Sequence, residues 1–356
     1  MTSTTSKLFE PVKLGNLTLQ HRIVMAPMTR YKADDAHVPF LPLVSDYYAE
    51  RASTPGTLLI TEATFIAARA GGYAHIPGIW SADQIAAWKT VTAAVHAKGS
   101  FIFLQLWALG RTADAVQFGM SGPPPRPLTV PEIKEYVQMY VQAAKNAMEA
   151  GFDGVEVHSA NGYFLDQFLQ DVSNKRTDEY GGSIENRARF TLEVIDAVVT
   201  AIGAEKTGTR VTPWSPFQDM GMADPLPTFS YLISQLVERH PHLAYIHLVE
   251  PRIIGNATRD EDAIGAHESN DALRALWAPR PIIRAGGFSR ASAIEAAESG
   301  DLIAFGRRYI SNPDLPARLA QNAPLAGYDR STFYLIGENT PRGYTDHAFA
   351  MATAAA

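Results

Sequence analysis

One short stretch, from Gly154 to Tyr163, joins a strand-like run to side chains that could do chemistry. The β-branched run ends at His158, and an amide, Asn161, and a phenol, Tyr163, follow closely. An imidazole and a carboxamide can both donate hydrogen bonds to one substrate oxygen, and a phenol can deliver a proton. The trio therefore suits activation and protonation of a carbonyl-conjugated substrate. The competing interpretation is that His158 and Asn161 cap the helix that follows.

Composition and charge exclude several kinds of site and partner. The chain has 356 residues, 46% of them hydrophobic, so it can form two ordinary domains or one large barrel. It contains no cysteine, which excludes disulfides, thiolate metal ligands and a cysteine nucleophile. Its net charge of −6 gives no general reason to bind nucleic acid. We find neither a secretory leader nor a long apolar run, and therefore expect a cytoplasmic protein without a membrane segment.

Short apolar runs alternate with amphipathic stretches along the chain, as in parallel strands covered by helices. The expected strands are Arg22–Pro27, Thr57–Glu62, Phe101–Leu106, Gly154–His158, Arg210–Thr212, Tyr245–Val249, Pro281–Ala285 and Leu302–Phe305. The expected helices are Asp83–Ala97, Pro131–Ala150, Ile184–Ile202, Phe229–Arg239 and Ser289–Ser299. Thr129 and Gly151 bracket the second of these helices as N-cap and terminator.

This alternation predicts an α/β fold, a single (β/α)8 TIM barrel over residues 1–356, with disordered ends at 1–6 and 350–356. A hairpin within Phe9–Gln20, turning at Gly15, is expected to close the barrel bottom. A doubly wound sheet is the alternative. It is disfavoured because no Gly-x-Gly-x-x-Gly follows an early strand.

In a TIM barrel the active site lies at the C-terminal ends of the strands. The residues there are Pro27, Met28, Thr29, Glu62, Ala63, Gln105, Trp107, His158, Asn161, Arg210, Gly286, Gly287, Gly306 and Arg307. They include no paired carboxylates, Ser-His-Asp arrangement or metal-ligand cluster, which disfavours hydrolysis and a metal site. The glycines could admit a phosphate that pairs with Arg307, and Arg210 could face an electron-rich ring. The set thus indicates a planar anionic cofactor, although glycines can also simply turn a strand into a helix.

Longer motifs resemble the Old Yellow Enzyme family of FMN-dependent ene-reductases, in a fungal form. The most specific block runs from His158 to Tyr163 and continues through Asp166–Leu169 and Asn174–Phe190. Supporting motifs are Met25–Arg30, Gly71–Tyr73, Gln105–Trp107, His247–Pro251, Phe305–Arg307 and Ile310–Leu315. Three features depart from the family pattern: Ala63 replaces a common glycine, Gly287 replaces a larger residue of some relatives, and the proline-rich loop Gly110–Leu128 is short.

The resemblance implies a tightly bound FMN, reduced by NADPH or NADH, and a monomer or homodimer without nucleic-acid or membrane partners. The residues implied to contact FMN are Pro27, Met28, Thr29, Ala63, Gln105, His158 and Arg210 around the ring, and Gly286, Gly287, Gly306 and Arg307 at the phosphate. His158 and Asn161 would bind the carbonyl oxygen of an α,β-unsaturated aldehyde or ketone. Hydride would pass from the flavin to the β-carbon, and Tyr163 would protonate the α-carbon. Tyr73, Trp107 and Tyr334 would shape the substrate pocket.

Two other functions stay open at this point. One is a redox-neutral isomerase, which is disfavoured because such relatives carry phenylalanine where this chain has Tyr163. The other is a non-catalytic barrel that binds a flavin or a phosphoester. Asp178, Glu179, Glu185, Arg187 and Arg189 are expected to form a structural ion-pair network and not a catalytic group.

Overall fold

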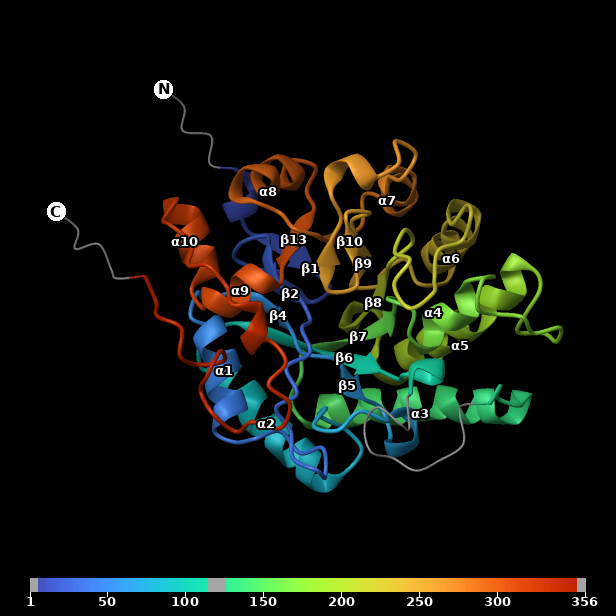
Figure 1. Cartoon of the computed structure of the whole chain (residues 1–356), viewed down its shortest axis with the longest axis horizontal. Coiled ribbons are helices and arrows are strands. Elements are labelled where there is room, and N and C mark those ends of the chain that lie inside the picture. Colours follow the sequence, from blue (N-terminus) through green and yellow to red (C-terminus); the bar gives the residue numbers. More distant parts are fainter. Residues whose placement is uncertain (1–5, 114–125, 351–356) are drawn as a thin grey trace.

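Eight parallel strands form a closed barrel in the computed structural model, which describes residues 6–113 and 126–350 (Figure 1). They are β3 (Ile23–Met25), β4 (Leu58–Ile60), β6 (Phe101–Trp107), β7 (Gly154–Ser159), β8 (Thr207–Val211), β9 (Tyr245–Val249), β12 (Ile282–Ala285) and β13 (Leu302–Phe305). Each pairs with the next in parallel, and β13 pairs back to β3, which closes the ring. The predicted (β/α)8 barrel is confirmed, and the doubly wound alternative is wrong.

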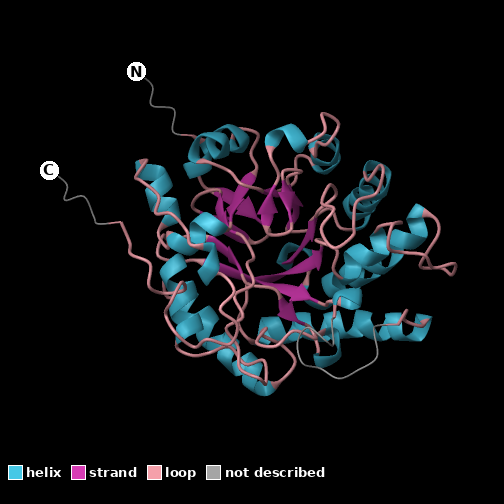
Figure 2. Cartoon of the chain, viewed as in Figure 1, coloured by secondary structure: helices cyan, strands magenta, loops and turns pink. Residues whose placement is uncertain are grey.

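Helices surround the strands on all sides (Figure 2). They are α1 (Leu43–Arg51), α2 (Ala82–His96), α3 (Val130–Glu149), α4 (Phe164–Leu169), α5 (Ile184–Ile202), α6 (Leu226–Arg239), α7 (Asp271–Trp277), α8 (Arg290–Ala297), α9 (Arg307–Ser311) and α10 (Leu315–Gln321). The five predicted helices are present, with ends shifted by up to three residues. Thr129 caps α3 in a reciprocal capping box with Glu132, and Gly151, just beyond its end, has φ 86°.

Smaller elements join or extend the barrel. The strands are β1 (Val12–Leu14), β2 (Leu17–Leu19), β5 (Thr64–Phe65), β10 (Ile253–Ile254) and β11 (Ala257–Thr258). The single 3-10 turns are η1 (Lys7–Phe9), η2 (Ala68–Ala70), η3 (Gly110–Thr112), η4 (Ala204–Lys206), η5 (Glu261–Ala263) and η6 (Arg330–Thr332). Strands β1 and β2 form the expected hairpin, and Leu14 and Leu19 are buried in one cluster with Phe103 and Tyr245 of the barrel.

One strand starts earlier than the sequence suggested. Strand β8 was expected over Arg210–Thr212 but spans Thr207–Val211, because Thr207, Gly208 and Thr209 carry a weak strand signal. Their conformation is set by pairing with β7 on one side and β9 on the other. Glycine is required at position 208 because a Cβ there would collide with the ring of Tyr245 inside the barrel. Pairing with the neighbouring strands, and not local strand propensity, therefore sets where β8 begins.

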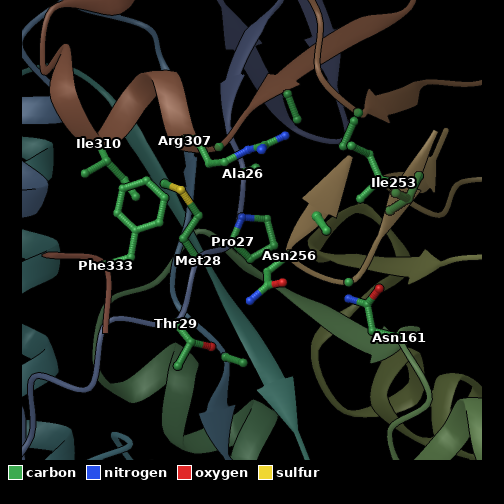
Figure 3. A pocket seen from close by; sticks show the side chains of 18 of the residues that line it. Ala26, Pro27, Met28, Thr29, Asn161, Ile253, Asn256, Arg307, Ile310 and Phe333 are labelled. Carbon is green, nitrogen blue, oxygen red and sulfur yellow. The ribbon is translucent and has the colours of Figure 1, made fainter. Parts of the chain in front are cut away.

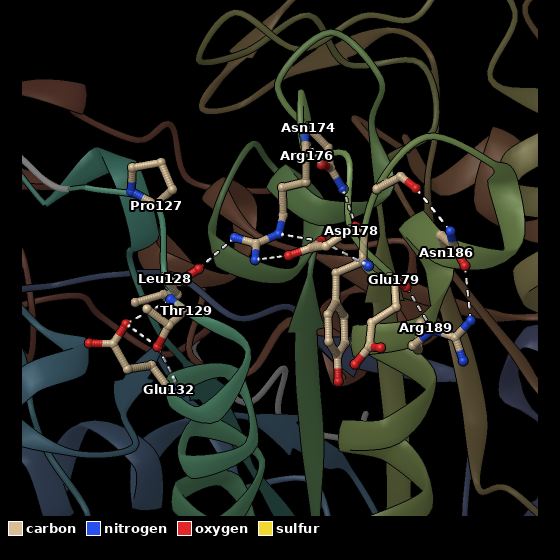
Figure 4. A network of polar contacts seen from close by, with 12 residues as sticks. Pro127, Leu128, Thr129, Glu132, Asn174, Arg176, Asp178, Glu179, Asn186 and Arg189 are labelled. Carbon is tan, nitrogen blue, oxygen red and sulfur yellow. Dashed lines mark hydrogen bonds and ion pairs between the residues drawn. The ribbon is translucent and has the colours of Figure 1, made fainter.

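The loop before α5 is fastened mainly by arginines that bind backbone carbonyls (Figure 4). Arg176 pairs with Asp178 and donates to the carbonyl oxygen of Leu128 at 2.7 Å. Arg189 donates to the carbonyl oxygen of Glu179, and Arg187 to those of Leu169 and Gly182. The prediction of an ion-pair network among these residues is therefore wrong. Asp178 does form an ion pair, but its partner is Arg176, which was not in the expected set. The arginines instead donate to backbone carbonyl oxygens of the loop and of the segments beside it.

The two ends of the described chain are attached to the barrel. The Ser6 hydroxyl contacts Glu298, and the backbone N–H of Ala350 donates to Asp314 at 2.7 Å. The disorder expected at 1–6 and 350–356 otherwise concerns residues 1–5 and 351–356, outside the described part of the chain. Among residues 6–113 and 126–350, no helix has the length and apolar character needed to cross a bilayer.

Candidate active site

A cavity of about 870 Å³ opens at the C-terminal ends of the barrel strands (Figure 3). All but one of the site residues expected from the sequence line it, namely Pro27, Met28, Thr29, Ala63, Tyr73, Gln105, Trp107, His158, Asn161, Tyr163, Arg210, Gly286, Gly287, Gly306, Arg307 and Tyr334. The exception is Glu62, which is buried behind the wall and accepts a hydrogen bond from the Arg30 N–H at 3.0 Å. Sequence reasoning missed other lining residues, among them Tyr31, Phe217, Ile253, Asn256, Phe288, Tyr328, Phe333 and Ile336. Most of these lie in loops, where no periodic pattern marks the residues that face inward.

Unpaired backbone donors lie at one end of the cavity. The N–H groups of Gly286, Gly287 and Gly306 donate to no other described residue. Gly286 and Gly287 have φ values of 143° and 67°, which side chains rarely allow. Arg307 begins α9 beside them, and its guanidinium donates to the Thr258 hydroxyl at 2.5 Å. This end of the cavity offers an anion several backbone donors and the positive charge of Arg307.

Deeper in the barrel lies a group of buried polar side chains. Gln105 donates its amide to Glu156 at 2.7 Å, and the Nδ1 of His247 lies 2.8 Å from the other oxygen of Glu156. Burial by itself would raise the pKa of Glu156, but the hydrogen bonds from His247 and Gln105 and the positive charge of Arg210 outweigh it, so the pKa is lowered overall. Burial also lowers the pKa of Arg210, although Glu156 opposes this shift. A guanidinium keeps its proton at neutral pH in any case, so Arg210 presents a positive charge to the cavity.

The three residues singled out first converge on the same cavity. His158 lies near the end of β7, and its ring is 5.3 Å from that of Tyr163 and nearly perpendicular to it. Burial, reinforced by Arg210, lowers the pKa of His158 to about 3, so the imidazole is neutral. Burial raises the pKa of Tyr163, so the phenol keeps its proton. The capping interpretation is wrong, because Tyr163 is the N-cap residue of α4 and the helix has no side-chain cap.

The loop between β7 and α4 is held in an unusual backbone conformation. Asn161 has φ 56°, and its backbone N–H donates to Thr212 while its carbonyl accepts from Gln218, both at 2.7 Å. Asp166, fully buried in α4, accepts from the Gly162 N–H at 2.8 Å and from the Gln170 amide at 3.0 Å. These contacts fix the directions in which Asn161 and Tyr163 point.

Aromatic side chains form the wall and rim of the cavity. The ring of Trp107 lies 4.7 Å from that of Tyr163 and 5.9 Å from that of Tyr73, whose hydroxyl donates to the Thr112 carbonyl oxygen. Tyr334 packs edge-on against Tyr31 at 6.0 Å, and 43% of it is exposed. The predicted pocket-shaping residues thus surround one space. They leave the mouth apolar and partly open.

Residues 328–344, the C-terminal rim segment, carry the outer part of this wall. Arg30 donates to the carbonyl oxygens of Phe333 and Gly343, at 3.1 and 2.6 Å. Lys32 donates to those of Leu335 and Glu338, and Arg51 donates to that of Tyr344. All three cationic side chains are at most 1% exposed. The segment is therefore attached to the barrel through its backbone and through the buried ring of Tyr344, which stacks on that of Tyr47 at 3.9 Å.

The donor set suits an anionic, acceptor-rich cofactor such as FMN. The Nε of Arg210 and the Nδ1 of His158 are buried and lack a partner among the described residues. Together with the free N–H groups at the phosphate end, they are donors that a bound ligand can satisfy. In the described part of the chain, no group of three or more His, Asp or Glu side chains could hold a metal ion.

Comparison with known proteins identifies the family. The family model described as "NADH:flavin oxidoreductase / NADH oxidase family" matches residues 7–326. The chain belongs to this family. Among solved structures, the Old Yellow Enzyme from Pichia sp. AKU4542 superposes with a TM-score of 0.87 and 39% identity, over 97% of this chain and 94% of that one. The chain is therefore an Old Yellow Enzyme family member, a flavin oxidoreductase, as the motifs suggested.

Other relatives of this flavin oxidoreductase are more similar in sequence than the Pichia enzyme. The chanoclavine-I aldehyde reductase fgaOx3 of Penicillium roqueforti is 52% identical over 97% of this chain and 96% of that protein. A protein of Epichloe festucae var. lolii named "probable inactive reductase easA" is 46% identical over 97% and 96%. A relative named inactive is thus nearly as similar to this chain as one named a reductase, so activity has to be judged from individual residues.

Proposed function

We propose that this chain is an FMN-dependent ene-reductase that uses NADPH or NADH to reduce α,β-unsaturated aldehydes or ketones. The observation that carries the proposal is the meeting of His158, Asn161 and Tyr163 at one cavity with the unpaired donors that suit FMN. When bound, FMN would accept hydride from the nicotinamide and pass it to the β-carbon of the substrate. The protein must then hold the carbonyl oxygen and supply one proton.

His158 and Asn161 are suited to hold that oxygen. A neutral imidazole donates from one nitrogen, and the carboxamide donates from its NH2 group, so the two can share one acceptor. Both donors strengthen their hold as negative charge develops on the oxygen, which lowers the barrier to hydride arrival at the β-carbon. The same pair would bind the carboxamide oxygen of nicotinamide, so that the two substrates take turns in one place.

Tyr163 is suited to deliver the proton. Its raised pKa keeps the phenol protonated at neutral pH, and its ring packs against Trp107 and beside His158. Replacing Tyr163 by phenylalanine retains this packing and removes only the acid, so we expect enone reduction to slow by about 10² to 10⁴. Reduction of the bound flavin by NADPH should not change.

Anaerobic stopped-flow absorbance measures the two half-reactions separately. Purified Tyr163→Phe is first mixed with NADPH, and the reduced enzyme is then mixed with cyclohexenone. An equal loss in both half-reactions would remove Tyr163 from the role of proton donor. If wild-type protein binds FMN but turns over neither cyclohexenone nor maleimide, the chain is a non-catalytic flavin-binding barrel. The relatives named inactive make this outcome worth testing.

The redox-neutral isomerase is the remaining alternative on this site. Net reduction consumes one reductant per product and leaves deuterium from labelled NADPH in the product, whereas isomerisation does neither. The presence of Tyr163 favours reduction. The names of the fungal relatives favour an unsaturated aldehyde as substrate, and the aromatic rim would suit a large apolar one.

A further inference from the structure

Four neighbouring strands, β6 to β9, place Gln105 and Arg210 in the wall of the cavity and Glu156 and His247 beside them inside the barrel. The strand registers bring them together, because Gln105 pairs with Glu156 across β6 and β7, and Arg210 pairs with His247 across β8 and β9. Gly208 is the register partner of Glu156 on β8, and it has no side chain to separate Glu156 from β9. Glu156 and His247 are fully buried, and Gln105 is 1% exposed.

The charge of Glu156 determines how the Gln105 carboxamide is oriented. An ionised carboxylate only accepts hydrogen bonds, so the NH2 group of Gln105 must point toward it, as the 2.7 Å contact shows. The carbonyl oxygen of Gln105 then points elsewhere as an acceptor. The pyrimidine edge of a flavin presents one N–H between two carbonyl groups. An acceptor held in a fixed direction can pair with that N–H, whereas a freely rotating amide would spend part of its time presenting a donor to it.

His247 completes the arrangement in its neutral form. Its Nδ1 contacts Glu156 at 2.8 Å, while its buried Nε2 has no partner among the described residues. A proton on Nε2 would create a buried cationic donor without an acceptor, which is costly. His247 therefore donates one hydrogen bond to Glu156 and adds no charge. The negative charge of Glu156 therefore offsets the nearby positive charge of Arg210.

We propose that Glu156 is a positioning residue for the flavin ring, which orients the Gln105 amide and offsets the charge of Arg210. The inference rests on the proposed function, because it concerns the FMN of that site. It gives Glu156 and His247 a role that the sequence motifs containing them did not suggest. Glu156 would have two separable effects, one on the affinity for FMN through Gln105 and one on the flavin potential through its charge.

Glu156→Gln removes the charge while keeping the shape. The new amide can present either its oxygen or its NH2 group to Gln105, so the direction of the Gln105 amide is no longer fixed, and FMN binding should weaken about tenfold, the usual effect of one misplaced buried hydrogen bond. The positive charge of Arg210, now unopposed, should shift the flavin potential to a more positive value. Apoprotein titration with FMN, followed by fluorescence quenching, gives the affinity, and equilibration with redox dyes gives the potential.

Two further variants separate the effects and a third controls for folding. Glu156→Asp keeps the charge but shortens the reach, so FMN binding should weaken while the potential stays near that of the wild type. In a Gln105→Leu background, Glu156→Gln should have little further effect on FMN affinity, because the two residues act together. Asp301→Asn removes another buried carboxylate, paired with Arg274 at the opposite end of the barrel, and should leave both quantities unchanged.

The outcomes are distinct. Folded Glu156→Gln protein with wild-type FMN affinity and potential would overturn the inference, as would additive losses in the Gln105→Leu background. If Glu156→Gln does not fold, Glu156→Asp decides, since unchanged FMN affinity in that variant overturns the inference in the same way. Wild-type protein that binds no FMN would instead overturn the proposed function itself.

Discussion

Asp166 tests whether the active-site loop depends on a single buried carboxylate. Asp166→Ala leaves two buried donors, the Gly162 N–H and the Gln170 amide, without their acceptor. Each unsatisfied donor costs about 1–3 kcal/mol, so the two together should lower the free energy of unfolding by roughly 2–6 kcal/mol. Removing the unfavourable burial of the carboxylate, which raises the pKa of Asp166 to about 7, will offset part of this loss.

The effect on catalysis should exceed the effect on cofactor binding. Gly162 lies between Asn161 and Tyr163, so release of its N–H allows both side chains to shift. A displacement of about 1 Å can cost roughly 10²-fold in rate, and we expect a loss of this size in kcat/KM for an enone. FMN affinity should stay close to that of the wild type, because the residues that would hold FMN lie on other loops and strands.

Asp166→Asn is the matched control, since the amide oxygen can still accept from Gly162 while its NH2 group faces the Gln170 amide. We expect its stability and rate to lie between those of the wild type and Asp166→Ala. Thermal unfolding, steady-state kinetics and FMN titration measure the three quantities. If Asp166→Ala keeps wild-type kcat/KM, or loses FMN affinity as strongly as activity, the loop does not depend on Asp166 in this way.

Two further predictions follow from charges at the site. Burial raises the pKa of Glu62 from an ordinary 4.5 to about 7, although the backbone N–H and the charge of Arg30 oppose this shift. The shift corresponds to roughly 3 kcal/mol in the free energy of unfolding. This contribution to stability is complete below pH 4.5 and is lost as pH rises through 7. The free energy of unfolding, measured with denaturant, should therefore fall less steeply between these pH values in Glu62→Gln than in the wild type. An equally steep fall in the variant would contradict the raised pKa of Glu62. Arg307→Ala should weaken FMN binding by about 10- to 100-fold through the lost charged hydrogen bond, yet leave binding of riboflavin, which lacks the phosphate, unchanged; equal weakening for both ligands would place Arg307 away from the phosphate.

The barrel could be predicted because its strands and main helices carry strong local patterns. Seven of the eight barrel strands appeared as clear apolar runs, β8 being the exception, and α3 was marked by both Thr129 and Gly151. Helix α4 escaped notice because it has only six residues, and α1 and α7 because nine and seven residues give little periodicity. The onset of β8 was missed because Thr207 and Gly208 are placed by pairing with their neighbours.

The site was predictable to the extent that its residues end strands. Gln105, His158 and Arg210 could be placed from the barrel rule alone, and family resemblance supplied their expected roles. The supporting residues could not be found in this way. Nothing in the sequence shows that Glu156 reaches Gln105 and His247, or that Asp166 holds the Gly162 N–H, because these contacts depend on strand register and loop folding. Asn256 and Phe333 reach the cavity from distant loops.

The attachment of the C-terminal rim segment has a consequence for how substrate range can diverge. Arg30, Lys32 and Arg51 bind main-chain oxygens, which every amino acid provides, so exposed side chains of this stretch such as Tyr334 and Ile336 can be exchanged without loosening its attachment. The segment also lies beyond residue 326, where the match to the family model stops. Natural variation or a designed graft can therefore change the mouth of the cavity, and with it the range of molecules that enter. The residues proposed to take part in hydride and proton transfer would stay the same.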